Sequence, residues 1–138
     1  MSGVCAVVVT HNRREMLRRC LAALADQRRV PDRILVVDNA SSDGTREMLG
    51  SEWAHVELLS LRSNEGGAGG FHEGIKRAYA GGAGWLLLMD DDTIPARDAL
   101  AELLDTAERL DLAARVDGVA EPALLASRVG GAMGRSTR

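Results

Sequence analysis

Three adjacent carboxylates, Asp90, Asp91 and Asp92, are the residues of this 138-residue chain whose types and spacing most clearly suggest chemistry. They follow the apolar run 85–89, which is too short to cross a membrane and is typical of a strand buried on both faces. Adjacent acids repel each other and are tolerated where water solvates them or a divalent cation holds them. Two interpretations are therefore open: a metal site, or a charged loop that keeps a strand end hydrated.

A further acid, Asp38, ends the apolar run 34–37 in the same way. In open α/β sheets, ligands bind in the crevice at the carboxyl ends of the strands. Carboxylates there can accept hydrogen bonds from the N–H of a base or from ribose hydroxyls, and they can ligate Mg²⁺ or Mn²⁺ against phosphates. A lone Asp38 would more often end a strand or cap a helix, but the second acidic strand end favours a shared ligand site.

The glycine-dense segment 64–71 invites a phosphate-binding interpretation, because glycines let backbone N–H groups approach an anion. It fits neither standard fingerprint: it lacks Gly-Lys-Ser/Thr, and His72 stands where the last glycine of G-x-G-x-x-G would be. We expect a flexible loop that opens a helix over 74–80. The other histidines, His11 and His55, are also more often polar loop residues than catalytic bases. No Cys/His spacing indicates zinc.

The elements that must position these residues alternate between strand and helix patterns. This alternation predicts an α/β fold with a doubly wound, mostly parallel sheet and helices on both faces. The expected strands are 4–10, 34–37, 55–61, 85–89 and, as a further candidate, 123–126. Two helices are expected over 45–49 and 74–80. Two more are indicated by apolar residues at helical spacing. The first has Leu17, Cys20, Leu21 and Leu24, and the second has Leu100, Leu103, Leu104 and Ala107.

Asn12 is predicted to cap the helix that contains Leu17, with Glu15 reaching back as in a capping box. Asp98 lies favourably in the first turn of the last helix. Cys5 and Cys20, the only cysteines, both fall at apolar positions and are expected to be core residues in a reducing compartment.

The composition describes one globular domain and excludes several classes of partner. The net charge of −3 gives no general attraction to nucleic acid or anionic lipid, and 3% aromatic residues is too few for base-stacking platforms. No signal peptide is evident, and no apolar stretch approaches the roughly 20 residues of a spanning helix. We therefore expect a cytoplasmic chain without a transmembrane segment.

Four segments, taken in order, resemble the motifs of family 2 glycosyltransferases with the GT-A fold. They are 8–13 (Val-Val-Thr-His-Asn-Arg), 36–44, 64–71 (Asn-Glu-Gly-Gly-Ala-Gly-Gly-Phe) and 89–92 (Met-Asp-Asp-Asp), and the resemblance spans residues 4–110. The glycine segment together with the triple Asp is similar to the branch that contains galactofuranosyltransferases and bacterial rhamnosyltransferases.

The resemblance implies a UDP- or dTDP-sugar donor and transfer with inversion at the anomeric carbon, in cell-envelope glycan synthesis. A divalent metal ion, Mn²⁺ or Mg²⁺, would neutralise charge that builds on the leaving diphosphate. The nucleotide would be bound by Thr10, His11, Asn12, Asp38, Asn64, Gly66, Asp90 and Asp91. Asp38 would receive the pyrimidine N3–H, His11 would replace the usual tyrosine beside the base, and Asp91 or a neighbour would meet the ribose. The metal would be held by Asp90 and Asp92.

One departure from the family pattern concerns the general base, an Asp or Glu that lies beyond the Asp-x-Asp motif. No acid after Asp92 matches this general base. Four acids fall on or near the last expected helix: Glu102, Asp105, Glu108 and Asp111. Asp117 and Glu121 have no supporting sequence context. We therefore expect 1–138 to be a single donor-binding domain, truncated before the acceptor half, that transfers sugar poorly. The full-length enzyme would use a glycan or lipid-linked acceptor at the inner face of the membrane. An exposed apolar face could make the shortened chain a homo-oligomer.

Two other classes share parts of this pattern. A non-catalytic nucleotide- or metal-binding module, such as a receiver-like domain, keeps its acids near the first strand and needs a late lysine, whereas the only lysine here, Lys76, is mid-chain. A nucleotidyltransferase would carry a glycine-rich basic loop after the first strand, and the segment 12–14 (Asn-Arg-Arg) has no glycine.

Overall fold

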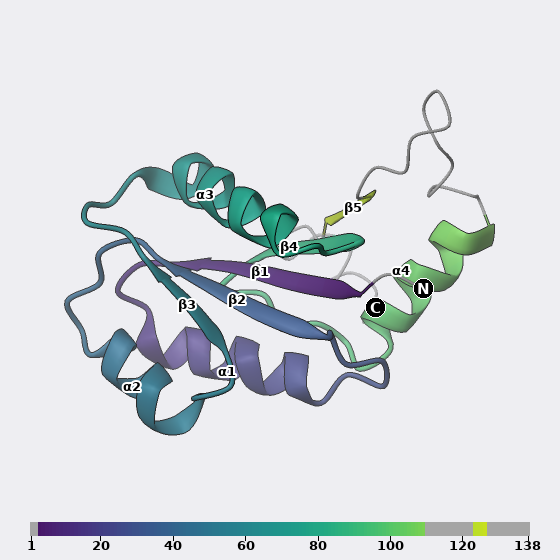
Figure 1. The fold of residues 1–138 in the computed structure, drawn as a ribbon. Coiled ribbons are helices and arrows are strands. Elements are labelled where there is room, and N and C mark those ends of the chain that lie inside the picture. Colours follow the sequence, from purple (N-terminus) through teal and green to yellow (C-terminus); the bar gives the residue numbers. More distant parts are fainter. Residues whose placement is uncertain (1–2, 110–122, 127–138) are drawn as a thin grey trace.

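A computed structural model of the chain describes residues 3–109 and 123–126, in which strands and helices alternate (Figure 1). The strands are β1 (Val4–Thr10), β2 (Arg33–Asp38), β3 (Glu57–Ser60), β4 (Trp85–Asp90) and β5 (Ala123–Ala126). The helices are α1 (Arg14–Ala25), α2 (Thr45–Glu52), α3 (Gly66–Ala80) and α4 (Ala99–Arg109). The expectations for Asp111, Asp117 and Glu121 lie outside the described residues.

The strands form one parallel sheet in the order β3-β2-β1-β4-β5, which confirms the predicted doubly wound architecture, including the fifth strand. Thr10 is level with Asp38 on one side of β1, and Val9 is level with Asp90 on the other. The strand order reverses between β1 and β4. In open α/β sheets the ligand crevice lies at this switch point, outside the carboxyl ends of the strands.

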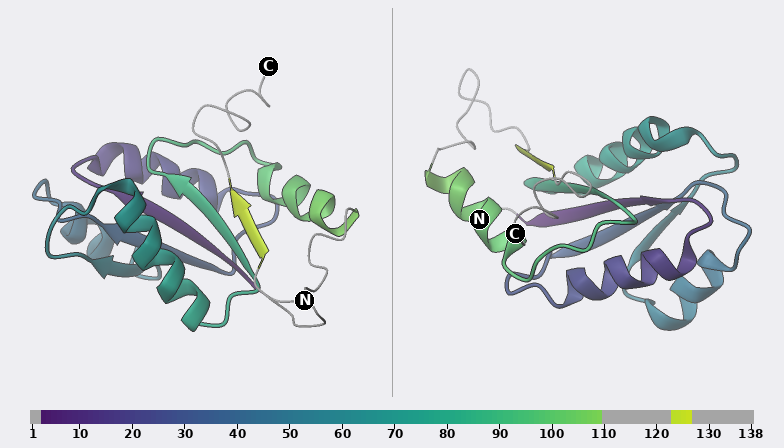
Figure 2. Two further views of the ribbon diagram at one scale, coloured as in Figure 1. Left: turned by 90° about the horizontal axis from the view of Figure 1, so that it is seen from above. Right: turned by 180° about the vertical axis from the view of Figure 1, so that it is seen from behind.

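Helices cover both faces of the sheet (Figures 1 and 2). Alternate residues of a strand point to opposite faces, and the two core clusters divide accordingly. Val4, Ala6 and Val8 of β1 share a cluster with buried residues of α1, α2 and α4, whereas Cys5, Val7 and Val9 share one with Ala78 of α3. The predicted apolar stripe of α1 is fully buried: Leu17, Cys20, Leu21 and Leu24. None of the helices in the described ranges is both long and apolar enough to span a bilayer.

The glycine-dense segment is helical, so the prediction of a flexible loop before residue 74 was wrong: α3 begins at Gly66. Gly70 and Gly74 lie on the buried face of α3 and allow it to approach the sheet closely. A Cβ on Gly70 would lie 2.6 Å from Val9 Cγ1, and one on Gly74 would lie 2.6 Å from Val7 Cγ1. Each glycine lowers the intrinsic stability of the helix by about 1 kcal/mol relative to alanine. Glycine is nevertheless required at these two positions, because no larger residue fits the contacts with the sheet.

The predicted capping box at the start of α1 is also absent. Arg13 is the N-cap residue and makes no side-chain capping hydrogen bond, while Asn12 has a left-handed backbone with φ +49°. The Asn12 side chain instead accepts a hydrogen bond from the Ser42 N–H at 2.7 Å. The Arg14 N–H of the first turn donates to Asp43 of the following βα loop at 3.0 Å, so tertiary structure supplies the cap.

Two smaller expectations had different outcomes. The third strand begins at Glu57 rather than His55, because Trp53–Val56 makes a turn with the Val56 N–H donating to the Trp53 carbonyl at 2.9 Å. Cys5 and Cys20 are buried and free, as expected for core residues.

Candidate functional site

The three acids at the end of β4 differ in their surroundings. The Thr10 hydroxyl, at the end of β1, donates to Asp91 Oδ2 at 2.8 Å, so Asp91 is turned inward and its side chain is only 5% exposed. Asp90 is the last residue of β4, and Asp91 and Asp92 form the turn that follows. Asp92 Oδ1 is buried without a hydrogen-bond partner. Asp91 therefore ties the two strand ends together, and Asp92 keeps an available oxygen.

Arg13 lies over this pair of acids. Its Nη1 is 3.3 Å from Asp91 Oδ1 and 3.6 Å from Asp92 Oδ2. Burial raises the pKa of Asp91, and the Thr10 hydroxyl and the Arg13 guanidinium partly oppose that rise. The pKa of Asp90 is raised by burial first and by the Asp92 carboxylate second. Groups with shifted pKa values at the edge of a crevice are typical of functional sites.

Asp38 is fully buried at the end of β2. Its Oδ1 accepts a hydrogen bond from the Ser41 N–H at 3.2 Å, and Arg46 Nε of α2 lies 3.6 Å from Oδ2. Within the described part of the chain, the buried side-chain oxygens without a hydrogen-bond partner are Asp38 Oδ2, Asp92 Oδ1 and Thr93 Oγ1. Because buried polar groups are nearly always paired, such oxygens are acceptor positions for a ligand at the strand ends.

His11 and Asn12 connect the end of β1 to the loop after β2. His11 Nδ1 lies 2.6 Å from the Asn39 carbonyl, which can only accept, so Nδ1 carries the proton. The backbone N–H of Asn12 donates to Ser41 Oγ at 2.9 Å. With Ser42 bound to the Asn12 side chain as well, the two loops that frame the β1–β2 side of the crevice are held against each other.

Asn39 joins this arrangement to the start of α3, and sequence reasoning gave it no role of its own. Its buried side chain donates to the Gly66 carbonyl at 2.9 Å and accepts from the Glu65 N–H at 3.1 Å. Asn64 Oδ1 accepts from the Gly66 N–H at 2.9 Å, and Gly66 has φ +75°, a conformation that glycine tolerates. The predicted residues Asn64 and Gly66 therefore reach the strand ends through Asn39.

Two arginines at this edge also lacked a predicted role. Arg13 follows the Thr-His-Asn segment, and its position directly after a strand was a signal that could have identified it. Arg46 lies on α2, eight positions beyond Asp38, and no sequence pattern connects the two. Only the packing of α2 beside the end of β2 brings them together.

The acids can be tested for their fit to a metal ion. Within residues 3–109 and the described strand 123–126, no three His, Cys, Asp or Glu side chains converge as a metal cluster. Mg²⁺ at phosphate sites is commonly held by one or two carboxylates together with substrate phosphates, so a cluster of three is not required. Asp90 and Asp92 would supply carboxylate oxygens, and Asp92 Oδ1 is buried without a hydrogen-bond partner. This donor set fits a hard divalent cation.

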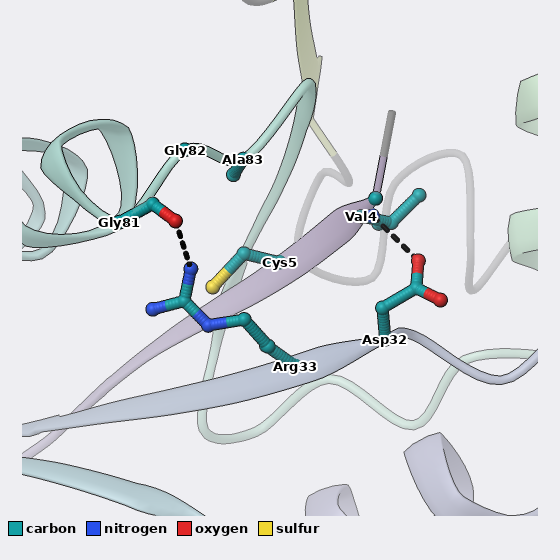
Figure 3. A pocket seen from close by; sticks show the side chains of 8 residues that line it. Val4, Cys5, Asp32, Arg33, Gly81, Gly82 and Ala83 are labelled. Carbon is teal, nitrogen blue, oxygen red and sulfur yellow. Dashed lines mark hydrogen bonds between the residues drawn. The ribbon is translucent and has the colours of Figure 1, made fainter. Parts of the chain in front are cut away.

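A small hollow of about 80 Å³ lies at the opposite, amino-terminal end of the strands (Figure 3). Arg33 donates to the Gly81 carbonyl at 3.2 Å and pairs with Glu57 at 2.8 Å, and the Val4 N–H donates to Asp32 at 2.7 Å. Burial raises the pKa of the Cys5 thiol here to about 11, so the thiol is protonated near neutral pH. The polar groups are paired with one another, and we interpret this hollow as structural.

Comparisons with known proteins identify similar sequences and similar folds. The family model described as "Glycosyl transferase family 2" matches residues 5–121. The galactofuranosyltransferase GlfT1 of Mycolicibacterium smegmatis is 46% identical over 111 residues, which are 80% of this chain and 37% of that protein. GlfT1 of Mycobacterium tuberculosis is 44% identical over 115 residues, with 80% and 38% covered. The chain thus spans less than two-fifths of the length of these relatives.

Solved structures share the fold. Staphylococcus aureus TarS 1–349 in complex with UDP superposes with a TM-score of 0.65 at 22% identity, covering 87% of this chain and 38% of that one. The mannosyltransferase PcManGT from Pyrobaculum calidifontis, in complex with GDP-Man and Mn²⁺, has a TM-score of 0.65 at 24% identity, with 77% and 32% covered. These likenesses support the arrangement of strands and helices described above.

Proposed function

This chain belongs to glycosyl transferase family 2, and from that premise we propose that the carboxyl edge of its sheet binds a nucleotide-diphosphate sugar together with a divalent metal ion. The observation that carries the proposal is the buried Oδ2 of Asp38 at the end of β2, which has the Arg46 guanidinium 3.6 Å away but no hydrogen-bond partner. UDP or UDP-GlcNAc in the TarS complexes, and GDP-Man with Mn²⁺ in PcManGT, support a donor of this class.

The proposed base site is at the β1–β2 side of the crevice. Asp38 Oδ2 accepts the N3–H of a pyrimidine, which uracil and thymine both offer, so UDP- and dTDP-sugars are the candidate donors. Thr10, His11 and Asn12 line the base, and the loop containing Asn64 and Gly66 lies near the donor. Because Asn39 holds this loop and the Asn12 loop together, the walls of the site are fixed before the ligand arrives, which lowers the entropic cost of binding.

The proposed metal site is formed by Asp92 and Asp90 and takes Mn²⁺ or Mg²⁺. When bound, the ion supplies positive charge that neutralises the diphosphate as the glycosidic bond breaks. The role of Asp91 is different: hydrogen-bonded to Thr10, it fixes the backbone from which its two neighbours project. It can contact the ribose only by giving up one of its present partners.

The proposed reaction is transfer of a galactofuranosyl unit, since the curated relatives are named galactofuranosyltransferases. Inversion at the anomeric carbon and a glycan or lipid-linked acceptor of the cell envelope are part of the proposal, as the resemblance to the family implies. We propose that the general base lies outside the described residues. The described acids after Asp92 are on or next to α4, and two of them form exposed ion pairs, Asp98 with Arg28 and Asp105 with Arg109.

Calorimetric titration of the purified chain with UDP and with dTDP, each with and without Mn²⁺, tests the proposal. We expect Mn²⁺-dependent binding that Asp92→Asn weakens at least tenfold, because the ion loses a charged ligand. Asp105→Asn removes an exposed acid of α4 and serves as the matched control, with unchanged affinity. A folded chain that binds neither nucleotide in the presence of Mn²⁺ would contradict the proposal and favour a non-catalytic α/β module.

A further inference from the structure

We propose that Arg13 is an exchangeable counter-ion of the acidic strand end. It holds Asp91 and Asp92 while the donor is absent and moves to the diphosphate when the donor binds, so that metal and nucleotide enter together. This inference rests on the proposed function. It adds a positioning residue to that function, and a coupling between the binding of metal and the binding of nucleotide.

The position of Arg13 is set by the backbone before it. Asn12 has φ +49°, and this strained conformation is held by Ser41 and Ser42, which bond its N–H and its side chain. The chain thereby turns sharply between β1 and α1. Arg13, at the N-cap of α1, extends its guanidinium to Asp91 and Asp92 in the turn after β4.

The contacts of Arg13 are those of a shared counter-ion. A single nitrogen, Nη1, is 3.3 Å from Asp91 and 3.6 Å from Asp92, two adjacent carboxylates that would otherwise repel each other. The Oδ2 of Asp92 contacts the arginine, whereas the Oδ1 has no hydrogen-bond partner. A cation that takes both oxygens of Asp92 must therefore displace Arg13 or accept it as a repelling neighbour.

Of the groups in this cluster, Arg13 is the one that can move. Its side chain is 55% exposed, whereas Asp91 is 5% exposed and fixed by the Thr10 hydroxyl. The Asp92 side chain is 33% exposed, so its ion pair with Arg13 is partly solvated and contributes little energy. A guanidinium binds phosphate oxygens with two parallel hydrogen bonds, which is a better match than one nitrogen shared between two carboxylates.

A competition follows between Arg13 and the metal. Without nucleotide, Arg13 lowers the affinity of Asp92 for a divalent cation. With nucleotide, the diphosphate gives Arg13 a new partner and supplies ligands to the ion. Metal and nucleotide then each raise the affinity for the other, and by linkage the two effects are equal.

The test is an Mn²⁺ titration followed by the electron paramagnetic resonance signal of free Mn²⁺, with and without saturating UDP. We expect Arg13→Gln to bind Mn²⁺ alone about three- to tenfold more tightly than the wild type, and to gain less from UDP. Arg14→Gln is the matched control: it removes the same charge one position later, where the side chain lies beside Gly44 instead. We expect it to change either affinity less than twofold at physiological salt.

The outcomes separate this inference from the proposed function. Normal Mn²⁺-dependent UDP binding, combined with an Arg13→Gln affinity for free Mn²⁺ that is unchanged or weaker, overturns the counter-ion role alone. Absence of Mn²⁺-dependent UDP binding in the wild type overturns both. Circular dichroism of each variant, recorded first, confirms that the compared proteins are folded.

Discussion

Thr10 and Asp91 are 81 positions apart in the chain, and the hydroxyl of the first donates to the carboxylate of the second at 2.8 Å. The hydrogen bond crosses from the end of β1 to the turn after β4, where the strand order of the sheet reverses. It leaves one member of the Asp triplet buried between the two strand ends, where it serves the scaffold, whereas the side chain of Asp92 is one-third exposed.

The first prediction tests this hydrogen bond. Thr10→Val removes the hydroxyl and leaves a buried carboxylate oxygen unpaired, which we expect to lower the free energy of unfolding by about 1–3 kcal/mol. Urea denaturation measures the change. Thr10→Ser keeps the hydroxyl and should cost clearly less; equal losses in the two variants would show that packing of the methyl group, rather than the hydrogen bond, matters here.

The second prediction concerns the glycines of α3. Gly70→Ala and Gly74→Ala should each destabilise the protein by about 1–3 kcal/mol, because the added Cβ would lie 2.6 Å from Val9 or Val7. In Gly67→Ala the same Cβ meets no neighbour within 4 Å. That variant should be neutral or more stable by up to about 1 kcal/mol. Thermal unfolding measures the midpoint temperature of each variant. Equal shifts of this temperature in all three variants would contradict the close-packing explanation.

The third prediction tests the role of Asp38 through the chemistry of the base. Uracil carries an N3–H, whereas N3 of cytosine is an acceptor that would face the carboxylate without a proton between them. We expect the chain to bind UDP at least tenfold more tightly than CDP in the presence of Mn²⁺. Asp38→Asn, which can present either an oxygen or an N–H, should reduce this preference to a few-fold. Competition titration measures both ratios, and equal affinities in the wild type would place the base elsewhere.

The fourth prediction follows from the buried thiol of Cys5. Burial raises its pKa to about 11, and the Arg33 guanidinium opposes this only partly. Because a raised pKa lowers the thiolate fraction at every pH below it, the folded protein should react slowly with iodoacetamide at pH 8. Peptide mass spectrometry measures the labelling of Cys5 separately from that of Cys20. Unfolding in urea should give Cys5 the full reactivity of an exposed thiol. Rapid labelling of Cys5 in the folded state would show that the strand end opens easily.

Much of the site was predictable because its residues follow strands that are easy to recognise. The runs before Asp38 and Asp90 are apolar on both faces, and such runs indicate buried parallel strands whose ends share one edge. The registers confirm this: Thr10 lies opposite Asp38, and Val9 lies opposite Asp90. The errors occurred where tertiary contacts override local patterns. The glycine-dense segment is helical from Gly66, and Gly70 lets this helix lie close to Val9 of the sheet. Asn12 does not cap α1, because its side chain accepts a hydrogen bond from Ser42.

By itself, then, the sequence determined the alternation of strands and helices, the parallel sheet and the edge at which its polar residues gather. The physical reason is that a helix buries one stripe of residues at helical spacing and a central parallel strand is buried on both faces, and both patterns can be read locally. The tertiary structure alone decided which acid faces inward, that Asn39 joins the loops around the crevice, and that Arg13 and Arg46 reach Asp91 and Asp38. These contacts depend on strand order and register, which place side chains from distant segments within a few ångströms of one another.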